Sequence, residues 1–410
     1  MIDLGLKRIS QLLPNISTLP WRAIHVAGTN GKGSICAYLT SILHSASIPV
    51  GRFTSPHLIH PHDSITINNA PVPQHLYNLA SSTIRSRNES LRIGATEFEI
   101  LTATAFECFT LAHVAVGVVE VGLGGRLDAT NVLRKKIACV VAKVDLDHQA
   151  FLGETLRDIA AEKAGIAVEG VRVVVDGGNP GEVLEAVEKV VERVGGEMVV
   201  PVVEVGKPGE GVKVTTEVFG TLRFTKMLPG RFQAANLACA VTALEEAVKR
   251  GHKITPEDVV TGVANTEWPG RLQTIDVRGI TKIPGSRVLL DGAHNPGAAK
   301  ELRAYIGDAE NVVWVLAFSK GKNVDEMVGI LIKENDTVVA TEFGAVEDMP
   351  WVKPVDASEI AAAVEKVGVP GSVAENVKDA LRRAFAEAQG RRVVVAGSLY
   401  MVGELLREMQ

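Results

Sequence analysis

The stretch HVAGTNGKGS, residues 25–34, decides the fold that this sequence predicts. An apolar run at 22–27 leads into it, and a helix-forming segment follows from about residue 33 to residue 46. The common phosphate-binding loop has four residues between its first glycine and its Gly-Lys pair, with Ser or Thr directly after the lysine. Here only Thr29 and Asn30 stand between the glycines, and one further glycine separates the lysine from the serine.

The residue types of this loop nevertheless suit the phosphates of a nucleotide. Glycines let the backbone approach a ligand and turn its N–H groups inward, and the following helix adds its N-terminal dipole. Lys32 supplies charge for the β- and γ-phosphates, and Ser34 offers a hydroxyl to Mg²⁺. The alternative is a plain glycine-rich turn with Lys32 in solvent. The strand–loop–helix setting favours a nucleoside triphosphate, and the residues assigned to it here are Gly28, Thr29, Asn30, Gly31, Lys32, Gly33 and Ser34.

Runs rich in Val, Ile and Leu alternate with longer stretches rich in Ala, Leu and Glu. Such alternation predicts an α/β fold with a mostly parallel sheet and helices on both faces. Strands with little polar alternation indicate burial on both sides. We expect strands at 22–27, 48–55, 114–121 and 138–143, and helices at 97–112, 154–164 and 233–249.

The pattern restarts late in the chain. The stretch RGITKIPGS, 278–286, has the composition of a linker or hairpin, and strand–helix alternation begins again at Val288. We therefore expect a nucleotide-binding domain over 1–280 and a smaller, Rossmann-like α/β domain over 281–410. Residues 181–215 are expected to form a helix and then a peripheral β excursion without chemistry.

Composition bounds the class of protein. The 410 residues are 46% hydrophobic and 22% charged, as in a soluble globular protein. A formal net charge of −5 argues against binding along a nucleic-acid backbone, and no apolar run reaches membrane-spanning length. Asp3 and the low arginine count argue against a transit peptide, so we expect a cytoplasmic location and leave a mitochondrial one open. The dispersed cysteines, which predict reduced thiols, are Cys36, Cys108, Cys139 and Cys239.

Three chemistry-bearing side chains follow expected parallel strands, at the sheet edge where ligands of α/β proteins bind. Ser55 lies in RFTSPHL, Glu120 ends the apolar run of VVEVGLGGRLDATN, and His148 lies in VDLDHQAFLG. A buried carboxylate needs a partner or a cation, and Mg²⁺ is a suitable one. Asp145 and Asp147 could orient His148 or pair with it. The alternatives are an ordinary Ser-Pro turn, a salt bridge from Glu120 to Arg126, and a plain surface histidine. GLGGRLD is not a dinucleotide fingerprint.

Other candidates also have ordinary structural explanations. Lys163 lies in the last turn of a helix, where a cation suits the dipole, and Gly165 suits a left-handed cap. Asn236 begins the helix after LPGRFQ, and Arg271 lies in a turn and fits the need for a guanidinium against phosphoryl charge. Ser398 stands at a helix N-terminus that could hold a carboxylate.

The loop DGAHNPG, 291–297, is the strongest motif of the second domain. Asn295 is expected to cap the next helix, and Pro296 suits its first position. Capping does not explain Asp291, at a strand end, or His294. These two residues are therefore candidates for function.

These motifs resemble one family, the Mur-type ATP-dependent amide ligases, and within it the folate branch of folylpolyglutamate synthase and dihydrofolate synthase. The matching segments occur in order across nearly the whole chain: GTNGKGS, TSPHL, EVGLGGRLDATN, LDH with LGETL, EKAGI, PGR and DGAHNP. The segments TEFEILTATAF and EFGAVEDMPW look more like dedicated dihydrofolate synthases. IHPHDSITINN departs from the polyglutamylating members and puts the usual substrate contacts there in doubt.

The resemblance implies roles for individual residues. Lys163 is expected to be carbamylated, which turns a cation into an anion that can hold metal. The implied Mg²⁺ ligands, for two ions, are Ser34, Ser55, Glu120 and His148. ATP contacts beyond the glycine loop are implied for Asn236, Arg271 and Asp291. The residues expected to contact the pterin substrate or glutamate are Gly124, Gly125, Arg126, Asp128, His294 and Ser398. The catalytic set is Lys32, Lys163, Arg271 and His294.

The implied reaction joins L-glutamate to 7,8-dihydropteroate through an acyl phosphate, with ADP and phosphate released. The alternatives are glutamate addition to tetrahydrofolate, or both activities in one enzyme. A phosphate-loop NTPase switch would leave DGAHNPG and the second domain unexplained. A non-catalytic nucleotide-binding regulator would be expected to lack Lys32, Glu120 or His148, and all three are present. We expect a monomer with small-molecule substrates and no nucleic-acid or membrane partner.

Overall fold

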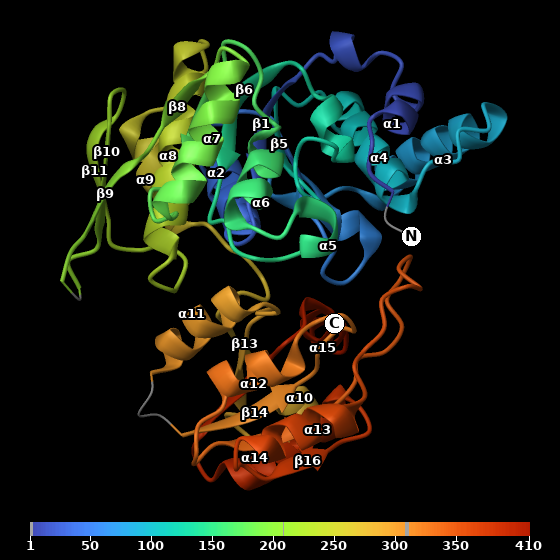
Figure 1. Cartoon of the computed structure of the whole chain (residues 1–410), viewed down its shortest axis with the longest axis vertical. Helices are drawn as coiled ribbons and strands as arrows, with labels where there is room; N and C mark the ends of the chain where they lie inside the picture. The colour runs from blue at the N-terminus through green and yellow to red at the C-terminus, as the bar shows by residue number, and fades with distance from the viewer. Residues whose placement is uncertain (1–2, 208, 308–310) are drawn as a thin grey trace. The chain divides into compact units, whose positions relative to one another are not determined.

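A computed structural model describes residues 3–207, 209–307 and 311–410, which form two compact α/β units (Figure 1). The first comprises Met1–His57, His62–Leu228 and Phe232–Glu267, and the second Leu58–Pro61, Pro229–Arg231 and Trp268–Gln410. The second unit thus begins earlier than a boundary after residue 280. The reason is β12 (Gln273–Asp276), which pairs antiparallel with β13 (Arg287–Leu290) and so joins the second sheet.

An eight-stranded sheet forms the centre of the first unit. Six of its strands are parallel, as expected, and two short strands add an antiparallel edge. In spatial order they are β4 (Ala70–Pro71), β3 (Ile65–Ile67), β2 (Val50–Phe53), β5 (Val116–Glu120), β1 (Arg22–Ala27), β6 (Lys136–Val141), β7 (Arg172–Val175) and β8 (Glu197–Val199). The central strands β5 and β6 are buried throughout, which explains their continuous apolar runs.

Helices cover both faces of this sheet. Helices α6 and α7 lie in front of it in the view of Figure 1, whereas α2 lies behind and packs against α8 and α9. The helices of this unit are α1 (Lys7–Leu12), α2 (Lys32–Ser45), α3 (Gln74–Ser90), α4 (Glu97–Leu111), α5 (Gln149–Leu152), α6 (Leu156–Ala164), α7 (Gly181–Arg193), α8 (Gln233–Lys249) and α9 (Pro256–Ala264), with 3₁₀ turns at Ile16–Thr18, Pro61–Ser64 and Ala129–Val132.

Local capping determines where several of these helices begin. At the start of α4, Glu99 N donates to Thr96 Oγ1 at 3.2 Å, and Thr96 N donates to Glu99 Oε2 at 2.8 Å. Thr255 and Asp258 form the same capping box at α9. Each cap satisfies N–H groups that the helix itself leaves unpaired and contributes about 1 kcal/mol.

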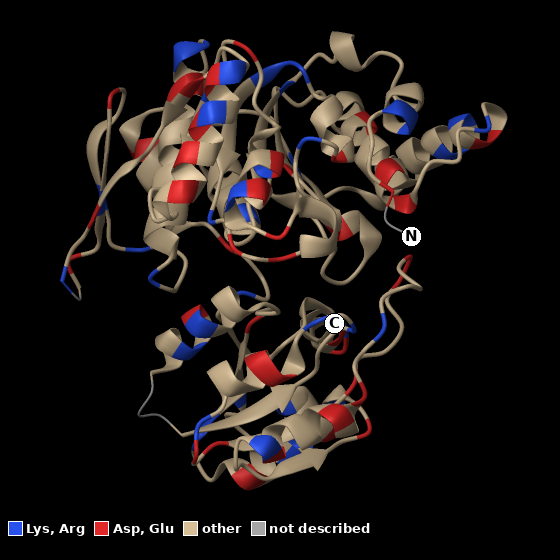
Figure 2. Cartoon of the chain, viewed as in Figure 1, with Lys and Arg blue, Asp and Glu red and all other residues tan. Residues whose placement is uncertain are grey.

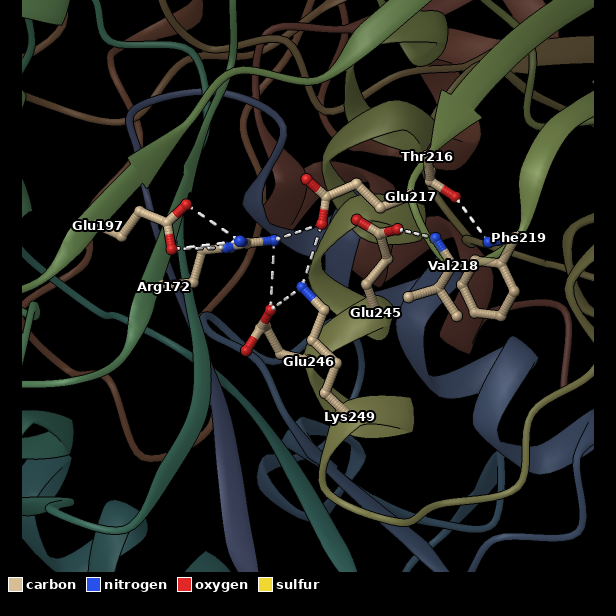
Figure 3. A network of polar contacts seen from close by, with 9 residues as sticks. All are labelled: Arg172, Glu197, Thr216, Glu217, Val218, Phe219, Glu245, Glu246 and Lys249. Carbon is tan, nitrogen blue, oxygen red and sulfur yellow. Dashed lines mark hydrogen bonds and ion pairs between the residues drawn. The ribbon is translucent and has the colours of Figure 1, made fainter.

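A separate antiparallel sheet confirms the expected peripheral excursion, and it extends beyond residue 215. Its strands are β9 (Val202–Val205), β10 (Val212–Thr216) and β11 (Gly220–Phe224). Polar contacts attach its β10–β11 turn to α8 and β7 (Figure 3). Val218 N donates to Glu245 Oε1 at 2.6 Å, and Glu217 pairs with Lys249 at 3.3 Å and Arg172 at 3.6 Å.

A six-stranded sheet forms the second unit, and only β12 runs antiparallel to its neighbour. In spatial order the strands are β12, β13, β17 (Arg392–Ala396), β14 (Val312–Leu316), β15 (Thr337–Ala340) and β16 (Gly371–Val373). Its helices are α10 (Arg278–Thr281), α11 (Pro296–Ile306), α12 (Val324–Leu331), α13 (Ala357–Lys366), α14 (Val377–Ala388) and α15 (Leu399–Arg407). Strands β13 and β17 end directly before Asp291 and Gly397, so the candidate residues of this unit meet at one sheet edge.

Charged side chains of both signs are interspersed over the two units (Figure 2). Over the described ranges, every helix falls short of the combined length and apolar character that crossing a bilayer requires. The four cysteines are all buried, free thiols, as predicted.

We predict that Gly262→Ala destabilises the first unit. A Cβ at Gly262 would lie 2.5 Å from Ile42 Cα and 2.8 Å from Ile42 N, so the α9 backbone would have to move away from α2. Overpacking of this kind costs about 1–3 kcal/mol. Denaturant unfolding measures the loss. The control is Gly181→Ala, at the first position of α7, where a Cβ meets nothing within 4 Å; equal stability of the two variants would contradict the prediction.

Candidate active site

The loop between β1 and α2 needs glycine at two positions for conformation and for space. Gly28 has φ +147° and Gly31 has φ +90°, where other residues are strained. A Cβ at Gly28 would lie 2.7 Å from Ala142 Cβ, and one at Gly31 would lie 2.3 Å from Asn236 Oδ1. The loop therefore packs closely on the end of β6 and on the first turn of α8.

Asp145 anchors the loop on its other side. Asn30 Nδ2 donates to Asp145 Oδ2 at 2.8 Å, and Thr29 Oγ1 exchanges hydrogen bonds of 3.1 Å with the Asp145 backbone. The aspartate beside His148 is Asp147, at 3.9 Å. The interpretation that both aspartates serve His148 is therefore wrong for Asp145, whose side chain holds the glycine loop in place.

A cation and a carboxylate meet where β1 and β5 end. Lys32 Nζ lies 3.7 Å from Glu120 Oε1 and donates to Thr29 O at 3.2 Å. Glu120 is 5% exposed. The alternative of a Glu120–Arg126 salt bridge is wrong, because Arg126 pairs with Glu162 at 2.8 Å. A phosphate could attract Lys32 and a divalent cation could attract Glu120, so either charge can exchange its partner when such ligands bind.

Lys163 lies under the glycine loop. Its side chain is buried, with the residue 4% exposed, and Nζ donates to Gly28 O at 2.9 Å. Burial lowers the Lys163 pKa to about 7, and the positive charge of Lys32 adds to the effect. An amine with this pKa is partly neutral, and therefore nucleophilic, at neutral pH.

The expected left-handed cap at Gly165 is wrong. Gly165 has φ −60° and continues the right-handed turn of α6. It must be glycine for a different reason, because a Cβ there would lie 2.4 Å from Arg126 Cβ and 2.8 Å from Arg126 Cα. The end of α6 and the loop after β5 thus approach backbone to backbone.

The loop after β5 is organised from within by Asp128. Its buried carboxylate accepts hydrogen bonds from Leu123 N at 2.9 Å and Thr130 N at 3.0 Å. Burial raises the Asp128 pKa, and these hydrogen bonds oppose the rise. The substrate contacts assigned to this loop stay predictions; they are Gly124, Gly125, Arg126 and Asp128.

Gln233 belongs to the same cluster of side chains as Ser34 and Asn236, although no sequence motif indicated it. Its Nε2 donates to Ser34 Oγ at 3.1 Å, and its Oε1 accepts from Asn236 Nδ2 at 3.1 Å. Gln233 precedes Asn236 by three residues, a spacing that puts both on one face of α8. This spacing is the sequence feature from which the position of Gln233 beside Asn236 could have been predicted. Ser34, Gln233 and Asn236 form one buried polar chain.

In the second unit, Asp291 organises the turn that carries Arg271. The Asp291 carboxylate accepts from Leu272 N at 2.9 Å and from Ala293 N at 2.8 Å. Burial raises its pKa, and the positive charge of Arg271 opposes that rise. A Cβ at Gly292 would lie 3.5 Å from Arg271 Cζ, so the guanidinium packs over this glycine.

The neighbouring His294 has a defined tautomer. Nδ1 lies 2.8 Å from Gly292 O, a carbonyl that can only accept, so Nδ1 carries the proton and Nε2 the lone pair of the neutral ring. Asn295 caps α11 through Ala298 N at 2.9 Å, with Pro296 following, as predicted. Ser398 caps α15 and is buried; its contact with a substrate carboxylate stays a prediction.

The residues predicted to bind Mg²⁺ combine two serines, Ser34 and Ser55, with Glu120 and His148. Throughout the part of the chain that the structure describes, no three His, Cys, Asp or Glu side chains are grouped so that they could hold a metal ion. His148 precedes α5 in the left-handed region, with φ +54°, and its side chain is about half exposed. Glu120 is a suitable oxygen donor for Mg²⁺. A shared site of Ser34, Ser55, Glu120 and His148 stays a prediction.

Comparison with known proteins identifies relatives along the whole chain. A family model described as "Dihydrofolate synthetase, C-terminal domain" matches residues 273–408. A probable dihydrofolate synthetase of Schizosaccharomyces pombe is 39% identical, with 100% of this chain and 99% of the relative covered. The dihydrofolate synthetase of Saccharomyces cerevisiae is 40% identical, with 99% and 98% covered. A probable folylpolyglutamate synthase of the same yeast is 27% identical, with 98% and 96% covered.

Solved structures agree with this likeness. Escherichia coli FolC in complex with DHPP and ADP has a TM-score of 0.86 at 28% identity, with 100% of this chain and 94% of that chain covered. A bifunctional folylpolyglutamate synthase/dihydrofolate synthase with Mn, AMPPNP and L-glutamate has a TM-score of 0.83 at 26% identity, with 100% and 95% covered. The fold is that of a Mur-type ligase. The chain belongs to the dihydrofolate synthetase and folylpolyglutamate synthase family.

We predict that the Lys163 amine titrates near pH 7 and that Lys32→Met raises this pKa, because the mutation removes one of the charges that lower it. Labelling lysines with ¹³C at Cε and following chemical shift against pH by NMR measures both values. Lys163→Met identifies the signal by its loss. Titration of Lys163 near the ordinary lysine pKa of about 10.4 would contradict the prediction.

Proposed function

We propose that this protein is a dihydrofolate synthase, which joins L-glutamate to 7,8-dihydropteroate and converts ATP to ADP and phosphate in the same reaction. The pairing of Lys32 with Glu120 at 3.7 Å, at the glycine loop, carries the proposal. It places a phosphate-seeking cation and a cation-seeking carboxylate at the edge of one parallel sheet. Sequence identity favours dihydropteroate as the acceptor, because this chain is 40% identical to the yeast dihydrofolate synthetase and 27% identical to the probable folylpolyglutamate synthase of the same yeast.

Several residues of the first unit are suited to bind ATP and Mg²⁺. Backbone N–H groups of the glycine loop, Lys32 and Asn236 are suited to the nucleotide, and relatives have been solved with ADP and AMPPNP. Glu120, with Ser34, Ser55 and His148, would hold the metal, and carbamylation of Lys163 would add an anion. We infer two Mg²⁺ ions, which when bound neutralise phosphate charge during phosphoryl transfer.

The first half-reaction activates the acid. The dihydropteroate carboxylate attacks the γ-phosphorus of ATP, the bond to the β-phosphate oxygen breaks, and an acyl phosphate and ADP form. The Lys32 ammonium would turn from Glu120 to the phosphates. The Arg271 guanidinium would neutralise the negative charge of the phosphoryl group during its transfer. Catalysis here consists of positioning and charge neutralisation.

The second half-reaction forms the amide. The glutamate amine attacks the acyl carbon, the C–O bond to phosphate breaks, and the amine loses a proton. His294 is suited to accept that proton at Nε2, because Nδ1 already donates to Gly292 O. Arg271, held in its turn by Asp291, then stabilises the departing phosphate. Ser398, at the start of α15, would orient the glutamate carboxylate.

A second candidate is glutamate addition to tetrahydrofolate, alone or as a further activity. The observation in its favour is that structural neighbours are named folylpolyglutamate synthases or bifunctional enzymes. The departure at IHPHDSITINN and the higher identity to dihydrofolate synthetases favour dihydropteroate. We further propose a cytoplasmic monomer that acts on small molecules, in keeping with its composition and net charge of −5.

The acceptor is tested by incubating the protein with MgATP and labelled glutamate. We expect labelled product and stoichiometric phosphate release with dihydropteroate, and much less or none with tetrahydrofolate. Omitting the acceptor or glutamate should suppress phosphate release, because a ligase couples the two half-reactions. Product from tetrahydrofolate alone would overturn the proposed substrate. ATP hydrolysis that needs neither co-substrate would favour a switch.

We predict that Lys32→Ala and Glu120→Ala each abolish ligation, a loss of more than about 10³-fold, because each removes a charge that ATP or its metal must meet. Circular dichroism should show both variants folded. Lys135→Ala serves as the matched control, since Lys135 is an exposed lysine that donates to Leu19 O. Wild-type ligation in either site variant would refute the assignment of phosphate and metal contacts.

A further inference from the structure

One buried lysine has no part in the mechanism above. Lys136, the first residue of β6, is 2% exposed. Its Nζ donates to Asn131 Oδ1 at 2.9 Å and to Ile166 O at 2.6 Å. Both acceptors are neutral oxygens, and Ile166 lies just past the C-terminal end of α6.

Asn131 extends these contacts to two backbone carbonyls. Its Nδ2 donates to Arg126 O at 3.1 Å and to Gly165 O at 3.0 Å. Arg126 N donates in turn to Glu162 O at 2.9 Å. Lys136 and Asn131 therefore fasten the loop after β5 to the last turn of α6, and we call this pair the α6 clamp.

Stability alone does not explain a lysine at this position. Taking an ammonium out of water is costly, and an apolar side chain of similar volume is often neutral or stabilising in its place. Burial lowers the Lys136 pKa to about 8, which reflects this cost. The partial negative charge at a helix C-terminus offsets part of it. A buried charge kept at such a cost is best explained by the geometry that it imposes.

That geometry includes Lys163, in the last turn of α6. Its Nζ reaches Gly28 O at 2.9 Å, under the glycine loop. A Cβ at Gly125 would lie 2.7 Å from Lys163 O, so the loop after β5 also lies directly against this turn. Movement of the end of α6 would carry the amine away from the phosphate loop, and misplacement of a reacting group by about 1 Å can cost about 10²-fold in rate.

We propose that Lys136 and Asn131 are positioning residues for ligation: through the α6 clamp they hold the Lys163 amine against the glycine loop. The inference rests on the proposed function for its kinetic consequence. Its geometric consequence, the position and environment of Lys163, is independent of which substrates the enzyme ligates.

The first test is Lys136→Met, which keeps an unbranched side chain only one atom shorter and removes the ammonium group. We expect kcat for ligation to fall about 10- to 100-fold, as for other residues that orient a functional group, with little change in KM for MgATP. Val173→Ala is the matched control, since Val173 lies in the apolar core that also contains Ala164 and Ile166, and its truncation lowers stability while both residues of the α6 clamp stay unchanged. A kcat for Lys136→Met equal to that of Val173→Ala would overturn the proposal.

Two further readouts follow Lys163 itself. Native mass spectrometry in bicarbonate should show a carboxyl group added to Lys163 in the wild-type protein and in Val173→Ala, and not in Lys136→Met. By NMR titration, the Lys163 pKa should rise toward its ordinary value in Lys136→Met, because the released amine gains solvent. An unchanged Lys163 pKa in Lys136→Met would contradict the role of the α6 clamp. Because this measurement does not need ligase activity, it tests the clamp separately from the proposed function.

Asn131→Ala keeps the test decisive if Lys136→Met fails to fold. It removes the bonds to Arg126 O and Gly165 O and leaves the ammonium bonded to Ile166 O. We expect the same loss of kcat and the same upward shift of the Lys163 pKa, in smaller measure. Wild-type kcat and Lys163 pKa in a folded Asn131→Ala protein would refute the proposal.

Discussion

The hydrogen bond from the Lys163 ammonium to the Gly28 carbonyl is the contact on which the active site of the first unit depends. It joins α6 to the glycine loop, two segments far apart in the sequence. The buried amine is expensive to charge, and its pKa of about 7 records that cost. Its charge can therefore change at neutral pH, next to a loop suited to phosphates. The shape of the loop and the state of the amine depend on each other.

Other charged side chains are likewise only partly compensated by a neighbour of opposite charge. Lys32 pairs with Glu120, and the positive charge of Lys32 also lowers the pKa of Lys163. Within the second unit, taken by itself, the positive charge of Arg271 opposes the rise in the pKa of the buried Asp291 carboxylate. Each of these charged groups can exchange its partner when a phosphate or a cation arrives. A site built in this way can bind polyanions without carrying a large net charge.

Local rules account for the predictions that were confirmed. Strand–helix alternation predicted both sheets, and Asn295 and Pro296 begin α11 because capping is decided within one turn. Gly165 shows where such rules end. Its position after a helix indicated a left-handed cap, yet its missing Cβ makes room for Arg126, which is distant in sequence. Asp145 was expected to contact His148, three residues away, and instead contacts Asn30. Arg126 was considered as a partner for Glu120 in the same motif, and instead pairs with Glu162.

The order of residues was enough to establish an α/β chain with a glycine loop after its first strand, since periodicity, glycine spacing and capping act over a few neighbouring residues. The pairing of charges was settled by folding alone. Lys32 with Glu120, Lys163 with Gly28, and Lys136 with Asn131 and Ile166 depend on which strands become neighbours and on how closely helices approach the sheet. Coulomb energies and desolvation vary steeply with distance and burial, which exist only in the folded chain.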